Sequence, residues 1–224
     1  MALTLKAAVA TIFFYCLSAA IYFFAAGRWD LALGWTYFTL NCLVSVVLVV
    51  GLGVKDPGLL RERIKPGPGE RDKLFRPVST VMSVVTMIVA GVDAGRKHWW
   101  PVVPEWLQIA GLVLVFVGML FLTWALFTNS FFSIAVRLQP DRQQVLVSSG
   151  PYAIVRHPGY TGGFLYLFFT GLALGSWWAT LTTIPAIVLT VRRTLLEETM
   201  LREGLPGYRE YAARVRYRVL PGIW

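Results

Sequence analysis

The chain has 224 residues, of which 56% are hydrophobic and 15% are charged, and its mean hydropathy is +0.60. This apolar content is too high for a soluble domain of this size and indicates a membrane protein. The net charge of +9 does not require a nucleic-acid partner, because the basic residues that flank membrane helices explain it. Cys16 and Cys42 lie inside apolar runs, so we expect neither a disulfide framework nor a metal site.

Six apolar segments predict an all-α integral membrane protein with about six transmembrane helices. They span residues 5–26, 31–54, 78–94, 106–128, 160–175 and 177–194. The first is long enough to span a bilayer, which favours a retained helix over a secretion signal. The fifth has only 16 residues, or about 24 Å of helix, and no charge separates it from the sixth. We therefore expect a tight helical hairpin, with a kink at Pro185 in its second arm.

Two large polar loops and a charged tail connect and follow these segments. The loop 55–77 has a predicted short helix at 58–64, and the second loop covers 129–158. Beyond Arg192 the pattern stays helical as far as 204–207, and a shorter helix is expected at 208–215. We interpret 1–128 as the N-terminal transmembrane helices and 129–224 as the catalytic region, including C-terminal helices that form a pocket, within one structural domain.

The distribution of basic residues predicts the orientation. With six crossings, 18 of the 21 Lys and Arg residues fall on the side that holds both termini, and three fall on the other. The positive-inside rule places the richer side in the cytoplasm. The sequence thus predicts a multi-pass protein whose two termini and active site are cytoplasmic.

Few residues in these polar parts are of a type that carries chemistry. Arg193 and Glu197 are four apart and share a helix face, although a surface ion pair with a snorkelling arginine is the simpler reading. His157 is one of two histidines, and without further ligands at suitable spacing it does not indicate a metal site. Tyr208 and Tyr211 are three apart, a pattern that an aromatic belt would also give. None of these signals is specific alone.

Their order along the chain, however, resembles a known family. The pattern LV-x-x-G-P-Y-x-x-x-R-H-P-x-Y-x-G is followed by a helical hairpin, R-x-x-x-E-E, Y-x-x-Y-x-x-R-V and a late proline. This resembles the isoprenylcysteine carboxyl methyltransferase family, part of a wider group of membrane methyltransferases that includes phospholipid N-methyltransferases. The resemblance covers roughly residues 129–221.

The resemblance implies S-adenosylmethionine as cofactor and a set of residues that bind it: Gln144, Val145, Leu146, Val147, Tyr152, His157, Pro158, Gly159, Tyr160 and Glu197. It also implies that Arg193 binds the acceptor carboxylate, and we add Tyr208 and Tyr211 as candidate substrate-binding residues. The family often has histidine where this chain has Gln144, and glutamine cannot titrate near neutral pH.

The expected reaction is methyl transfer to a lipid-like or prenylated acceptor that enters from the bilayer. An acceptor carboxylate needs no base, so orientation by Arg193 would supply most of the catalysis. An amine acceptor would need a proton acceptor, for which Glu198 or His157 is the candidate.

Three other functions stay open at this point. One is N-methylation of a phospholipid or another amphipathic amine. Another is an NADPH-dependent sterol or enone reductase, although Gly159 and Gly163 stand where those enzymes have asparagine and an acidic residue. The third is a non-enzymatic protein that keeps the fold. The sequence does not indicate the oligomeric state.

Overall fold

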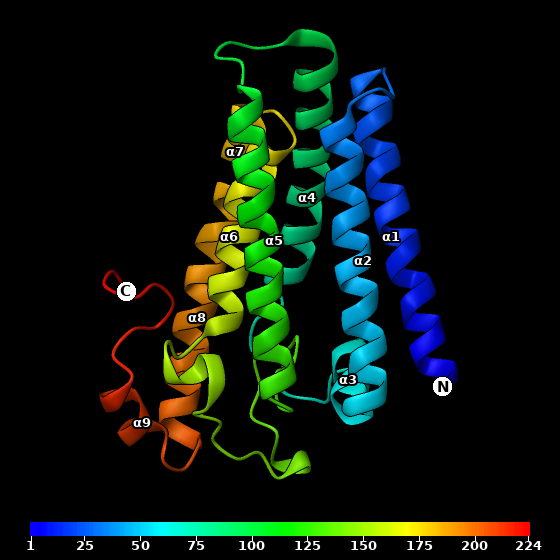
Figure 1. Ribbon diagram of the computed structural model, residues 1–224. Coiled ribbons are helices and arrows are strands. Elements are labelled where there is room, and N and C mark those ends of the chain that lie inside the picture. The colour runs from blue at the N-terminus through cyan, green and yellow to red at the C-terminus, as the bar shows by residue number, and fades with distance from the viewer.

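A computed structural model describes residues 1–224, and its regular secondary structure is entirely helical, without strands. Six longer helices form the bundle (Figure 1): α1 (Ala2–Ala26), α2 (Ala32–Lys55), α4 (Phe75–Val92), α5 (Glu105–Thr128), α6 (Pro158–Ala173) and α8 (Ile184–Gly204). Three short helices complete the fold: α3 (Pro57–Ile64), α7 (Trp177–Thr182) and α9 (Tyr208–Arg214). The all-α membrane fold expected from the sequence is therefore confirmed.

Five helical segments are long and apolar enough to cross a membrane: Ala2–Ala26, Ala32–Lys55, Phe75–Lys97, Glu105–Thr128 and Trp177–Gly204. The remaining bundle helix, α6, has 16 residues, which corresponds to about 24 Å. The apolar length thus supports a multi-pass protein, while the number of six crossings stays a prediction.

The hairpin predicted for the fifth and sixth segments is α6 followed by α7 and α8. At the turn, Gly175 has a φ of +83°, and the Ser176 hydroxyl caps α7 by accepting a hydrogen bond from the amide of Ala179 at 3.0 Å. In place of the kink predicted at Pro185, the structure has a break at Thr183: α7 ends at Thr182, and Pro185 lies in the first turn of α8. Proline fits there because its missing N–H would have no helical partner.

A close contact between α5 and α6 sets the position of the α6 start. A Cβ atom on Gly162 would lie 2.4 Å from the carbonyl oxygen of Gly118, and one on Gly118 would lie 2.8 Å from that of Gly162. Small residues at a helix crossing allow backbones to approach in a membrane, where van der Waals packing drives association. Gly162 therefore serves helix packing, and Gly163 has open space around it.

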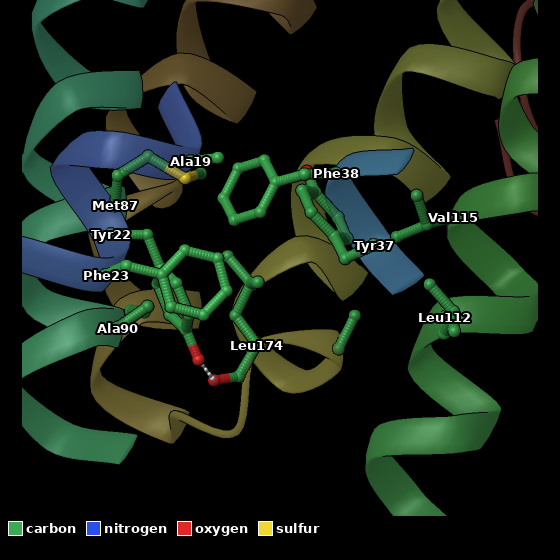
Figure 2. Close-up of a cluster of buried hydrophobic side chains, with 12 residues drawn as sticks. Ala19, Tyr22, Phe23, Tyr37, Phe38, Met87, Ala90, Leu112, Val115 and Leu174 are labelled. Atoms are coloured by element: carbon green, nitrogen blue, oxygen red, sulfur yellow. Dashed lines mark hydrogen bonds between the residues drawn. The ribbon is translucent and has the colours of Figure 1, made fainter. Parts of the chain in front are cut away.

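The largest buried cluster joins the N-terminal helices to this pair. It brings together side chains from α1, α2, α4, α5 and the end of α6 (Figure 2). Within it, the hydroxyl of Tyr22 donates a hydrogen bond to the carbonyl of Leu174 at 3.2 Å. The cluster packs the N-terminal helices against the hairpin, while the division into domains stays a prediction.

The polar segments gather at one end of the bundle. The N-terminus, α3, the loop between α5 and α6, and α9 all lie at the lower end in Figure 1. The turns between α1 and α2, between α4 and α5, and between α6 and α7 lie at the opposite end. At this end, the loop between α5 and α6, the start of α6, α8 and α9 enclose a pocket.

Candidate functional site

A pocket lies between the 129–157 loop, the start of α6, the lower part of α8, and α9. It has a volume of about 690 Å³ with its open mouth included, and its walls are mixed polar and apolar. All ten residues predicted to bind the cofactor line it: Gln144, Val145, Leu146, Val147, Tyr152, His157, Pro158, Gly159, Tyr160 and Glu197.

The segment 144–147 forms the outer wall. Val145 is 62% exposed, whereas Leu146 and Val147 pack against a buried cluster that includes Tyr152 and Tyr208. The side-chain oxygen of Gln144 accepts a hydrogen bond from the amide of Gln139 at 2.9 Å. Glutamine is therefore used here to close a local turn, which requires no titratable group.

The start of α6 forms the inner wall. Pro158 occupies the first turn of this helix and His157 precedes it. Gly159 is required for packing, because a Cβ atom there would lie 2.1 Å from the ring of Phe132. Phe132 and Phe131 also line the pocket, and no sequence motif singled them out.

A tyrosine connects the pocket to Arg193. The hydroxyl of Tyr160 donates to the carboxylate of Glu197 at 2.6 Å and accepts from Nε of Arg193 at 2.9 Å. Arg193 does not line the pocket and is only 4% exposed. Its guanidinium also donates through Nη2 to the carbonyl of Ile134 and lies 4.6 Å from the ring centre of Phe75. Tyr160 thus links Glu197, which is predicted to bind the cofactor, to Arg193, which is predicted to bind the acceptor.

Glu198 lies behind the pocket wall and is 3% exposed. One oxygen is 3.0 Å from Nε2 of His157, and the other is 2.8 Å from Nη2 of Arg202. Arg156 bridges both oxygens, at 3.0 and 3.1 Å. Both oxygens of Glu198 are therefore engaged by neighbouring cations and by His157, and its catalytic role stays a prediction.

Arg156 is a central residue that sequence reasoning left without a role. It is 5% exposed and donates to the carbonyls of Val215 at 2.6 Å and Arg216 at 2.8 Å. It thereby ties the α6 start to the tail beyond α9. The only sequence signal was its place in the Arg-His-Pro motif.

Tyr208 and Tyr211 also line the pocket, and α9 positions both. The hydroxyl of Tyr211 donates to the carbonyl of Tyr152 at 2.7 Å, and that of Tyr208 donates to Glu198 at 3.3 Å. Burial raises the pKa of both phenols well above the ordinary value of 10.0. Both therefore stay neutral and hold the tail in place, while their predicted contact with a substrate remains a prediction.

A second buried ion pair braces the loop that forms the pocket. Arg137 donates to the two oxygens of Glu62 on α3, at 2.9 Å each, and the two side chains are 2% and 6% exposed. Although burial raises the pKa of Glu62, hydrogen bonds from Arg137 and from Ser133 hold it below the ordinary value. Glu62 and Arg137 are 75 residues apart in the sequence, so no sequence pattern predicted that they pair.

Comparison with known proteins shows which proteins the chain resembles. A family model described as "Phospholipid methyltransferase" matches residues 106–206. The protein-S-isoprenylcysteine O-methyltransferase of Rattus norvegicus is 37% identical over 79 residues, which are 34% of this chain and 28% of that protein. A probable protein-S-isoprenylcysteine O-methyltransferase of Oryza sativa subsp. indica is 29% identical over 122 residues, which cover 53% of this chain and 61% of the rice protein.

The fold agrees over nearly the whole chain. A solved structure of the eukaryotic intramembrane Ras methyltransferase, isoprenylcysteine carboxyl methyltransferase, matches with a TM-score of 0.56 and 20% identity, covering 96% of this chain and 86% of that one. The chain is therefore similar to isoprenylcysteine carboxyl methyltransferases in fold and, over part of its length, in sequence. The matched segments span 28% and 61% of the two relatives named above, and the family model covers α5 to α8, which carry most of the pocket.

Proposed function

We propose that this chain is a membrane methyltransferase of the isoprenylcysteine carboxyl methyltransferase family. It transfers a methyl group from S-adenosylmethionine to the carboxylate of a lipidic acceptor of the prenylated-cysteine type. The observation that carries the proposal is that ten motif residues line one pocket. One of them, Tyr160, accepts a hydrogen bond from Arg193.

The donor set of the pocket suits this cofactor. Glu197 offers a carboxylate to the cofactor's ammonium group, and the α6 start offers backbone N–H groups to its carboxylate. Tyr152 and the apolar side chains of 144–147 suit a flat base, and tyrosine rings attract a sulfonium cation. When bound, the cofactor supplies an electrophilic methyl group.

Arg193 would bind and orient the acceptor carboxylate. Its Nε and Nη2 are held by Tyr160 and Ile134, whereas Nη1 has no hydrogen-bond partner. A preorganised guanidinium with one free nitrogen can hold an anion at little entropic cost. Because a carboxylate is already anionic at neutral pH, the residues need only align it and exclude water.

A cavity within the bundle suits the apolar part of the acceptor. It has a volume of about 930 Å³ with its open mouth included and lies between α1, α2, α4, α6 and α8, with apolar and hydroxyl side chains such as Phe14, Tyr166 and Ser79 on its walls. Its Ser79 lies one helical turn beyond Phe75, whose ring contacts Arg193. An acceptor that enters from the bilayer would thus reach Arg193 with its polar end.

N-methylation of an amine is the second candidate, since the matching family model is described as phospholipid methyltransferase. An amine would need a general base in contact with it. Glu198 is surrounded by Arg156, Arg202 and His157, and Nε2 of His157 is directed at Glu198. This arrangement leaves neither group free, which favours the carboxylate acceptor.

The proposal extends to orientation. The end of the bundle that carries the pocket also carries the N-terminus and α9, and the predicted topology assigns 18 of the 21 basic residues to that side, which favours a cytoplasmic active site.

Calorimetric titration of the purified protein tests the cofactor. We expect saturable binding of S-adenosylmethionine and S-adenosylhomocysteine, and none of NADPH. Binding of NADPH without binding of either methionine cofactor would overturn the proposal in favour of a reductase.

A further inference from the structure

The segment 65–74, between α3 and α4, folds back over Arg193. It contains the run Pro66-Gly67-Pro68-Gly69 and no helix. The amide of Arg71 donates to the carbonyl of Val136 at 3.1 Å, and the amide of Val136 donates to the Glu70 side chain at 3.0 Å. The segment is therefore docked on the loop that forms the pocket.

This docking buries the carboxylate of Asp72 beside Arg193. The side chain of Asp72 is 1% exposed. Its Oδ1 accepts a hydrogen bond from Nη1 of Arg192 at 2.9 Å, while its Oδ2 lies 3.8 Å from Nη1 of Arg193. That distance gives attraction without a hydrogen bond.

The two facing atoms are both buried and both without a hydrogen-bond partner. Such atoms are rare in folded proteins, and each one calls for an explanation in terms of strain, an unseen ligand or function. Every other polar atom of the Arg193 guanidinium has a partner. Nη1 is thus the nitrogen left to bind an acceptor, and Asp72 is the group that now faces it.

We propose that Asp72 is a specificity-determining residue that competes with the acceptor carboxylate for Arg193. This inference rests on the proposed function of Arg193. Without acceptor, Asp72 helps to balance the charge of the buried guanidinium. When the acceptor binds, its carboxylate balances that charge instead, and Asp72 moves aside. A neutral or cationic group gains no such attraction to the guanidinium and therefore competes poorly with Asp72.

The same competition would favour product release. Methylation converts the anionic acceptor into a neutral ester, which no longer balances the charge of Arg193. Asp72 then regains its position and the ester leaves. The competition therefore discriminates between substrate and product, which differ by one methyl group and one charge.

The segment is built so that Asp72 can move. Gly69 has a φ of +98°, a conformation that glycine adopts without strain, and few hydrogen bonds hold the segment to the 129–157 loop. Arg192, the other partner of Asp72, is 48% exposed and can follow it into solvent.

Steady-state kinetics of Asp72→Asn tests the inference. Asparagine has the same shape and keeps an oxygen for Arg192, but it removes the competing charge. With an N-acetyl-S-prenylcysteine as acceptor, we expect the acceptor KM to fall by about tenfold. The reason is that the state in which Arg193 is free to bind the acceptor, a minor population in the wild type, becomes more populated. We also expect the methyl ester product to inhibit the variant more strongly than the wild type.

Asp141→Asn is the matched control, because Asp141 pairs with Arg137 rather than with Arg193, and its KM should stay at the wild-type value. An unchanged or raised KM for Asp72→Asn, with the wild type active, would overturn the role of Asp72 alone. Absence of methyl transfer by the wild type would instead count against the proposed function.

If Asp72→Asn does not fold, the wild-type protein provides the test. Trypsin should cleave after Arg71 and Lys73, both exposed, faster when the prenylcysteine carboxylate is present, and the methyl ester should have no such effect. Equal cleavage with both compounds would overturn the inference.

Discussion

Replacing Tyr160 with phenylalanine tests the connection between the pocket and Arg193. The change removes one hydroxyl that donates to Glu197 at 2.6 Å and accepts from Arg193 at 2.9 Å, and it leaves the ring in place. Hydrogen bonds to charged partners contribute roughly 1.5–3 kcal/mol each. Since solvent and new contacts recover part of this, we expect a loss of about 2–4 kcal/mol in transition-state stabilisation.

This loss corresponds to a fall in kcat/KM of roughly thirty- to thousandfold. Arg193 and Glu197 are four residues apart on α8, so without the hydroxyl they are free to pair with each other directly. Activity should therefore fall far more than thermal stability. A radiometric methyl-transfer assay, with thermal unfolding measured in parallel, separates the two effects.

Tyr217→Phe is the matched control, because its side chain is 39% exposed and the backbone contact of this residue is unaffected. It should keep wild-type kcat/KM. A Tyr160→Phe variant with more than half of wild-type kcat/KM would refute the idea that this hydroxyl holds Arg193 for catalysis.

Four further predictions concern the charged residues. Glu197→Ala should weaken S-adenosylhomocysteine binding at least about tenfold by calorimetry, since a charge-assisted contact is lost; unchanged affinity would remove Glu197 from the cofactor site. Arg193→Ala should keep cofactor affinity and lose most acceptor turnover; if turnover persists, the arginine is misassigned. Glu198→Gln leaves buried cations unbalanced and should cost about 3–5 kcal/mol of stability, seen as a lower Tm, whereas wild-type Tm with lost activity would indicate a direct catalytic role. The folded-state pKa of Glu62 is lowered, so its contribution to the free energy of unfolding is present above about pH 4.5 and is lost as pH falls through the folded pKa. Tm measured between pH 7 and 3 should show this loss in the wild type but less of it in Glu62→Gln. Identical Tm profiles for the two proteins would contradict the assignment.

Sequence reasoning found the pocket because its residues are close together along the chain. The wall residues 144–147, Tyr152 and 156–160 lie within one short stretch of the chain, and Glu197 lies on the helix that returns from the hairpin. A motif records such neighbours directly. The interruption near Pro185 was equally accessible, because proline limits helices through local sterics.

Other parts of the site depend on contacts between distant loops, which no periodicity encodes. Glu62 and Arg137 are 75 residues apart, and Asp72 and Arg192 are 120 apart. Each looks like an ordinary solvated charge in its own segment. The engagement of Glu198 by Arg156 and His157 was hidden for the same reason, since it arises only when the α6 start meets α8.

The chemical nature of the methylated product tests the central claim most directly. Purified protein should be incubated with S-adenosylmethionine labelled in its methyl group and with an N-acetyl-S-prenylcysteine. We predict incorporation of label in an alkali-labile form that releases methanol, as a methyl ester does. Absence of transfer, or label that appears only in an alkali-stable form on an amine phospholipid supplied in parallel, would contradict the account.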